Sequence, residues 1–274
     1  MKKISRRSFL AAAAVSAAAL ALTACGGASS SVASSVASSA AASSSASGSL
    51  ATVVAGKLTM ATNATFPPYE MTTDSGDIAG IDIDTAKAIA EKLGLELQVD
   101  DMEFDAALLS VQQGKADMVM AGVTVTDERK AVMDFSDSYA TGIQSIIVPN
   151  GSDIASPDDL AGKKIGTQRG TTGYIYCSDD FGDDAVVAYD SGLTAVQALN
   201  NGQVDAVVID NAPAKEYVAA NPGLAILDTS YAEEDYAIGM AKGSSLEAAV
   251  NAALEELKAD GTLQSIVDKY ITAE

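Results

Sequence analysis

Histidine and tryptophan are absent from the 274 residues of this chain. Without an imidazole the chain cannot build a Ser-His-Asp triad or a histidine-ligated metal site. An enzymatic function would therefore depend on carboxylates, Lys, Tyr or one of the two cysteines, Cys25 and Cys177. If Cys25 is lipidated, as argued below, no internal disulfide is possible. A lone cysteine such as Cys177 is more often a small buried residue than a nucleophile.

Positive charge is scarce. The chain has 17 Lys and Arg residues against 37 Asp and Glu residues, which gives a net charge of −20. Residues 1–24 hold four of the basic residues and no acidic one, so removal of this segment would change the net charge to −24. Such an acidic chain repels nucleic acid and anionic lipid, and we expect no nucleic-acid partner.

No apolar run is long enough to cross a bilayer as a helix. The stretch Phe9–Ala24 follows four basic residues and has the composition of an export signal. Ser5–Leu10 resembles a twin-arginine signal. Leu22–Cys25 resembles a bacterial lipobox, which predicts a lipoprotein signal peptide at 1–24 and lipidation of Cys25. We therefore expect a protein anchored on the outer face of the cell membrane, extracellular or periplasmic, with ordinary secretion as the alternative.

A Ser/Ala-rich segment follows at residues 25–56, and its composition predicts a flexible linker. The remaining 218 residues are enough for two lobes of roughly 100 residues each. An internal echo supports two lobes, because residues 198–210 repeat the pattern of residues 110–122. Both segments contain a helix end, a Gly, an Asp before a buried strand, and a loop at the carboxyl end of that strand.

Alternating strand and helix patterns along both halves predict an α/β fold. Lys57–Thr62 and Met118–Ala121 read as strands, and Asp84 is the expected N-cap of the next helix. Residues 246–259 and 263–271 are expected to form two closing helices. The acidic run 179–184 does not match the spacing of a calcium loop, so we expect a solvated surface and no metal there.

Arg129 is the first indication of a binding site. Thr126 is a predicted helix N-cap followed by Asp127 and Glu128, so a cation in the first turn is electrostatically misplaced. Backbone N–H groups at this turn, the Arg129 guanidinium and the nearby Gly122 together suit a carboxylate or phosphate. The alternative is that Arg129 pairs with an acidic residue on the surface.

Three further segments lie where strands are predicted to end. Phe66 and Tyr69 belong to a loop containing two prolines, where they could contact a ligand or cap the core. The turn Gln168–Gly173 could present N–H groups to an anion, although it lacks the ending of a phosphate-binding loop. Asp210 ends a buried strand, where it could pair with an ammonium, cap the following helix, or do both.

Six motifs in this order resemble one family over residues 57–271, the bacterial extracellular solute-binding proteins of family 3, which deliver polar amino acids to ABC transporters. The motifs are Ala61–Glu70, Gly80–Asp84, Ala121–Arg129, Asp134–Ser136, Gly162–Gly166 and Asp205–Asp210. The resemblance implies a two-lobed α/β fold of the type II periplasmic-binding-protein kind. Its hinge would be two crossover strands near residues 139–143 and 232–236. Lobe 1 would comprise residues 57–140 and 237–274, and lobe 2 residues 141–236.

The resemblance also implies the roles of the site residues. Arg129 would bind the α-carboxylate, with the main chain near Gly122 and Thr124 and the turn near Thr172. Asp210 and the Gly122 carbonyl would bind the α-ammonium, while Phe66 and Phe104 would sandwich the ligand side chain. The candidate ligand-binding residues are Asn63, Phe66, Phe104, Ala121, Gly122, Thr124, Arg129, Gln168, Thr171, Thr172 and Asp210.

Two departures bear on the ligand. Position 63 is Asn where some relatives carry Asp, and position 168 is Gln where others carry Lys. These departures disfavour Lys or Arg as ligand and favour a neutral polar amino acid.

The implied function is the substrate-binding component of an ABC importer, which is not an enzyme and needs no cofactor or metal. Its partners would be a free zwitterionic amino acid, the permease and ATPase subunits, and the membrane through the lipid anchor. One alternative is a dehydratase acting on a prephenate-like acid, with Glu70 or Glu103 as the nearest acidic groups. The other is a surface amino-acid sensor or adhesion module.

Overall fold

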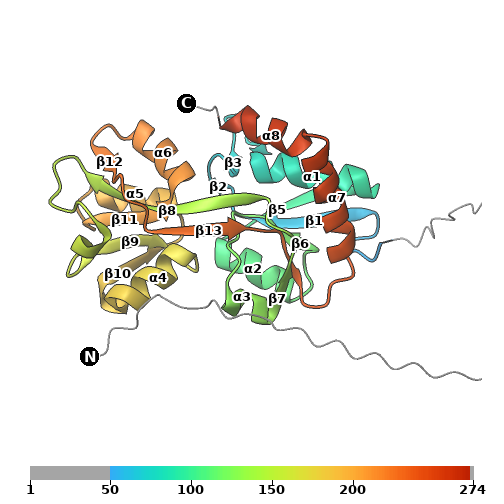
Figure 1. The fold of residues 1–274 in the computed structure, drawn as a ribbon, viewed down its shortest axis with the longest axis horizontal. Coiled ribbons are helices and arrows are strands. Elements are labelled where there is room, and N and C mark those ends of the chain that lie inside the picture. The colour runs from blue at the N-terminus through green and yellow to red at the C-terminus, as the bar shows by residue number, and fades with distance from the viewer. Residues whose placement is uncertain (1–49, 272–274) are drawn as a thin grey trace, which may run out of the picture. The chain divides into compact units, whose positions relative to one another are not determined.

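The structure is a computed structural model, and it describes residues 50–271. The predicted signal peptide, Cys25 and most of the predicted linker lie outside the described residues. Within the described part, two open β-sheets lie end to end with helices on both sides of each (Figure 1). No helix in this part is both long and apolar enough to cross a bilayer.

The first sheet has five strands in the order β5-β1-β6-β14-β7. Its strands are β1 (Lys57–Thr62), β5 (Glu96–Asp101), β6 (Met118–Val119), β7 (Met133–Phe135) and β14 (Gly239–Ala241). The helices of this half are α1 (Ile81–Leu93), α2 (Phe104–Gln112), α3 (Asp127–Val132), α7 (Glu247–Ala259) and α8 (Thr262–Tyr270). A small sheet completes it, formed by β2 (Thr65–Phe66), β3 (Glu70–Thr72) and β4 (Ile78–Ala79).

The second sheet has the order β10-β9-β11-β8-β12, with β13 also paired to β8. Its strands are β8 (Ala140–Pro149), β9 (Ile165–Gln168), β10 (Val186–Tyr189), β11 (Ala206–Asp210), β12 (Leu224–Ile226) and β13 (Ala232–Tyr236). The helices of this half are α4 (Thr172–Phe181), α5 (Gly192–Asn200) and α6 (Asn211–Ala220), with 3-10 turns at Pro157–Leu160 and Asp183–Ala185.

Strands β8 and β13 connect the two halves. They pair antiparallel from Ala232 opposite Gln144 to Tyr236 opposite Ala140. Figure 1 shows them side by side between the two sheets. The prediction of a two-lobed fold with two crossover strands as hinge is therefore confirmed.

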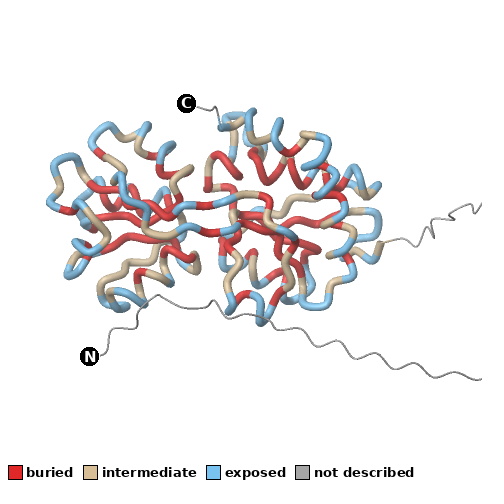
Figure 2. The backbone as a smooth tube through the Cα atoms, viewed as in Figure 1, coloured by how far each residue is buried: buried red, intermediate tan, exposed pale blue. Residues whose placement is uncertain are grey.

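The buried apolar side chains form one large cluster with members in both lobes and a smaller cluster within each lobe. Figure 2 shows the buried residues concentrated along the inner strands of both sheets and along the crossover strands. Met60, Met118 and Met120 are fully buried in the first lobe, and Ile165 and Val207 in the second. The loop that follows β6 and the carboxyl end of β11 both reach the space between the lobes.

Two element predictions were wrong in detail. Helix α1 begins at Ile81, so Asp84 lies in its first turn instead of capping it. The helix starts early because Gly80 has a positive φ of 143° and lies against the Tyr69 carbonyl, which ends the preceding strand there. Strand β6 ends at Val119, short of Ala121, and the chain then turns at Gly122 with a φ of 55°.

Candidate functional site

A narrow cavity lies between the two lobes, and it gathers most of the predicted site residues. Ten of the eleven candidates line it, together with Glu70; the ten are Asn63, Phe66, Phe104, Ala121, Gly122, Arg129, Gln168, Thr171, Thr172 and Asp210. Only Thr124 is not part of the lining. The free volume is about 20 Å³, room for roughly one water molecule. An amino acid can therefore enter only when the lobes move apart.

Arg129 is held inside the cleft and is not a surface residue. Its side chain is only 8% exposed, and its Nη1 donates to the Thr124 carbonyl at 2.7 Å. Its Nη2 donates across the cleft to the Gly170 carbonyl at 3.1 Å. No ion pair joins Arg129 to any carboxylate among residues 50–271. The guanidinium has further N–H groups that can bind an anion. An anion near Arg129 is what its position in the first turn of a helix predicted.

The local sequence explains how Arg129 is placed. Thr126 is the N-cap of α3, and its Oγ1 accepts from the Arg129 main-chain N–H at 3.2 Å. The predicted cap is thus confirmed. Arg129 also lies 5.5 Å from the centroid of the Phe104 ring, an arrangement that favours a cation over the ring face. Burial lowers the pKa of Arg129, and the nearby Glu234 opposes that shift.

Asp210 enters the cavity from the other lobe, at the end of β11. Gln144 Nε2 donates to its Oδ2 at 2.7 Å, and the Tyr236 hydroxyl donates to its Oδ1. Asp210 is the N-cap residue of α6 but makes no side-chain capping bond, so its carboxylate is used toward the cleft. Burial raises the pKa of Asp210 to about 7, although the Tyr236 hydrogen bond opposes the shift.

Three residues of the two crossover strands hydrogen-bond to residues that line the cavity, and the sequence did not predict them. Gln144 comes from β8, while Glu234 and Tyr236 come from β13; all three are buried. Glu234 lies in the run Glu233–Asp235, which looks like an exposed acidic surface. The only sequence signal for it is the alternation of β13, which turns Glu234 and Tyr236 inward and leaves Glu233 and Asp235 exposed.

The opposite end of the cavity contains amides, rings and one acid. Gln168 Nε2 donates across the cleft to Asn63 Oδ1 at 2.9 Å, and Phe66 and Phe104 line the cavity beside them. Glu70 is fully buried, and its carboxyl group hydrogen-bonds to that of Asp82. Burial and the neighbouring Asp82 raise the pKa of Glu70 well above its ordinary value. This end therefore offers oxygen acceptors between two aromatic rings.

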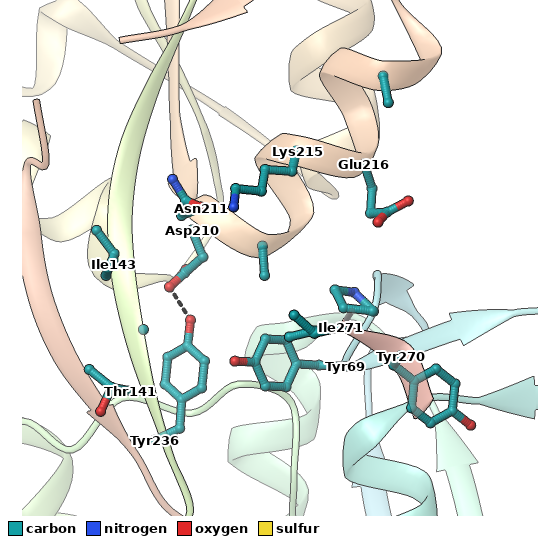
Figure 3. Close-up of a pocket in the computed structure, with 14 residues that line it drawn as sticks. Tyr69, Thr141, Ile143, Asp210, Asn211, Lys215, Glu216, Tyr236, Tyr270 and Ile271 are labelled. Carbon is teal, nitrogen blue, oxygen red and sulfur yellow. Dashed lines mark hydrogen bonds between the residues drawn. The ribbon is translucent and has the colours of Figure 1, made fainter. Parts of the chain in front are cut away.

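A larger groove of about 520 Å³ lies next to the cavity, and Figure 3 shows it. In that view Lys215 and Glu216 of α6 lie across from Tyr69, Tyr270 and Ile271. The groove shares only Asp210 with the cavity and lacks Arg129. We place the candidate site in the smaller cavity because a buried cation of one lobe, Arg129, and a buried carboxylate of the other, Asp210, both line it.

Comparison with known proteins identifies a family. The family model for bacterial extracellular solute-binding proteins, family 3, matches residues 58–273. A probable histidine-binding protein of Neisseria gonorrhoeae is 33% identical over 273 residues, which is 96% of this chain and 95% of that protein. The homologues are transport binding proteins and not enzymes.

Solved structures of amino-acid-binding proteins are also similar to this chain. The arginine-, lysine-, histidine-binding protein ArtJ of Geobacillus stearothermophilus has a TM-score of 0.76 and 36% identity, covering 80% of this chain and 96% of that one. An ancestral arginine-binding protein bound to glutamine also has a TM-score of 0.76, with 43% identity, covering 80% and 100% of the two chains. Amino-acid-binding proteins thus share both the fold and the length of the described part.

Proposed function

Because the chain belongs to the bacterial extracellular solute-binding proteins of family 3, we propose that it is the substrate-binding component of an ABC importer for a polar amino acid. The observation on which the proposal depends is that Arg129 of one lobe and Asp210 of the other line one cavity. A free amino acid has an anionic and a cationic end. Only the closed form lets both ends meet their partners at once, so binding favours closure.

A bound ligand would replace hydrogen bonds that now join the two lobes across the cleft. The bond from Arg129 to Gly170 and the bond from Gln168 to Asn63 both cross the cleft and occupy ligand-binding groups. A bound carboxylate would take donors of Arg129, and a bound side chain would separate the two amides. Each charge-assisted bond in the closed cleft contributes roughly 1.5–3 kcal/mol, which after the cost of association is consistent with a Kd of about 1 μM.

The ligand side chain would end in N–H donors. The amide pair of Asn63 and Gln168 supports our preference for a neutral polar side chain. Because its pKa is raised well above the ordinary value, Glu70 adds a neutral carboxyl group to this end, and its carbonyl oxygen can accept from a side-chain N–H. The side chains of glutamine and arginine both end in N–H donors.

The remaining parts of the proposal concern the cell. Lipidation of Cys25 after removal of residues 1–24 would tether the protein outside the membrane, and residues 25–56 would act as a flexible linker. A permease with its ATPase would then recognise the closed form and accept the amino acid. The lobe boundaries at residues 140, 141, 236 and 237 remain part of this proposal.

A thermal-shift screen of the mature chain tests the function. The panel is the twenty common amino acids with cystine and ornithine, followed by calorimetry on the positive compounds. We expect one or a few amino acids with N–H donors in their side chains to raise the melting temperature. A sensor or adhesion module with an incidental cleft would show no such rise. A dehydratase would instead convert a prephenate-like acid into an ultraviolet-absorbing product.

A further inference from the structure

Glu234 is a buried acid on the hinge that forms no ion pair within residues 50–271 and does not line the cavity. It is 6% exposed, and its Oε2 accepts three hydrogen bonds. The donors are Thr124 Oγ1 at 3.1 Å, Thr172 Oγ1 at 3.0 Å and Gln144 Nε2 at 2.9 Å. Thr124 belongs to the first lobe and Thr172 to the second, so one carboxylate oxygen joins both lobes through the crossover strand.

The protons in this network can be assigned from chemistry. A carboxylate oxygen only accepts, so each Thr hydroxyl uses its single proton on Glu234. Gln144 has two amide protons at Nε2, and it gives one to Glu234 and the other to Asp210. The Tyr236 hydroxyl gives its proton to Asp210. No hydroxyl or amide proton of these four side chains remains for a ligand.

The consequence is that these side chains can offer a ligand only hydrogen-bond acceptors. Thr172 lines the cavity with an oxygen that has only lone pairs left, and Asp210 lines it with a carboxylate. Ala121 and Gly122 belong to the same lining. An ammonium has three donors and no acceptor, so it fits these acceptors better than a hydroxyl with its single donor, and a carboxylate, which only accepts, does not fit them.

We propose that Glu234 is a positioning residue for the amino end of the site. By taking the hydroxyl protons of Thr124 and Thr172 and one amide proton of Gln144, it leaves the two hydroxyls as acceptors only and adds a second negative charge near Asp210. The preference for a primary ammonium then depends on Glu234 as well as on Asp210. The inference rests on the proposed function, because it assumes an amino acid in the cavity.

The test compares Glu234→Gln with Glu233→Gln, an exposed neighbour on the same strand, and with Asp210→Asn. Glutamine keeps the shape of the side chain but removes the charge and brings its own N–H donors. The probes are the amino acid that gives the largest shift in the screen and its analogue without the α-amino group. For L-glutamine the analogue is glutaramate, and for L-arginine it is 5-guanidinopentanoate. Calorimetry gives both affinities, and melting temperatures confirm that each variant folds.

We expect Glu234→Gln to weaken amino-acid binding at least about tenfold and to change binding of the analogue less than about threefold, while Glu233→Gln changes neither. The double variant with Asp210→Asn should lose less than the product of the two single losses, because both groups serve the same ammonium. The comparison of the double variant with the two single variants needs only the affinity for the amino acid. It therefore tests the role of Glu234 even where the analogue binds too weakly to measure.

Two results would overturn the inference. Equal losses for the amino acid and its analogue would mean that Glu234 acts on Arg129 or only holds the lobes together. Independent effects in the double variant would place Glu234 away from the ammonium. A wild-type chain that binds no amino acid of the panel would instead overturn the proposed function, and this inference with it.

Discussion

At the scale of the residue, Arg129 is the group on which the anionic end of the site depends. Arg129→Ala should weaken amino-acid binding by about 2–5 kcal/mol, because it leaves a buried carboxylate without its partner. Arg129→Lys should recover only part of the loss, since an ammonium lacks the planar fork of the guanidinium. Calorimetry measures both.

Arg169→Ala is the matched control for this prediction. Arg169 lies in the neighbouring turn, where its exposed side chain pairs with Asp190 at 3.5 Å. The Arg169→Ala variant should bind the amino acid with the affinity of the wild-type chain. Near-normal affinity of Arg129→Ala would contradict the assignment of the α-carboxylate to Arg129.

Asp210 predicts a pH dependence of binding. Burial and the nearby Glu234 hold the pKa of Asp210 at about 7 despite the hydrogen bonds from Tyr236 and Gln144. An ammonium requires the ionised form, so binding should release a proton below pH 7, and the affinity should fall by up to about tenfold per pH unit. Calorimetry at pH 8, 7, 6 and 5 gives the slope.

The control for the pH series is Asp210→Asn, which should bind weakly and lose this slope. The α-carboxylate and α-ammonium of a free amino acid do not titrate between pH 5 and 8. An affinity of the wild-type chain that stays constant from pH 8 to pH 5 would therefore exclude Asp210 as the ammonium partner.

Single residues also show how far sequence could predict this site. Arg129 was found because a cation in the first turn of a helix is unfavourable unless an anion is near, which is visible in the letters. Glu70, Gln144 and Glu234 were not placed in the site, because their roles depend on which side of a strand faces the cleft. An acidic run such as Glu233–Asp235 gives no such information without the strand pairing.

At the scale of the element, the crossover pair β8 and β13 holds the site. Gly142 of β8 lies against the ring of Tyr236 in β13, and a Cβ at this position would overlap that ring. Gly142→Ala should therefore displace Tyr236, whose hydroxyl holds Asp210. We expect a loss of about 1–3 kcal/mol of unfolding free energy, together with weaker amino-acid binding.

Gly223→Ala is the control for this element, because no atom lies within 4 Å of a Cβ placed there. Denaturant unfolding measures the stability of both variants, and calorimetry measures their binding. If Gly142→Ala bound the amino acid as tightly as Gly223→Ala does, the support of Asp210 by the crossover pair would be refuted.

Elements with local signals were predicted well. Strand β1 has the bounds read from its sequence, Lys57–Thr62, and the two closing helices expected from the sequence are α7 and α8, which are separated at Asp260–Gly261. The start of α1 was misplaced because the contact that fixes it, Gly80 against the Tyr69 carbonyl, is not local in sequence. Local propensity thus gave the elements, and tertiary contacts set some of their ends.

At the scale of the whole molecule, binding of a dipolar ligand depends on the two lobes and on the hinge that connects them. The hinge strands provide more than a flexible connection, because their inward side chains hold Asp210 and the two site threonines. Motion of the lobes and readiness of the site are therefore coupled through the same residues. A ligand that stabilises the closed form at the same time completes the shape that a permease would recognise.

The most direct test is a crystal structure of the mature chain with the amino acid selected by the thermal-shift screen. The account predicts a closed cleft in which the α-carboxylate contacts the Arg129 guanidinium and the α-ammonium contacts the Asp210 carboxylate. An amino acid bound elsewhere, or bound between the lobes without either of these two contacts, would contradict it.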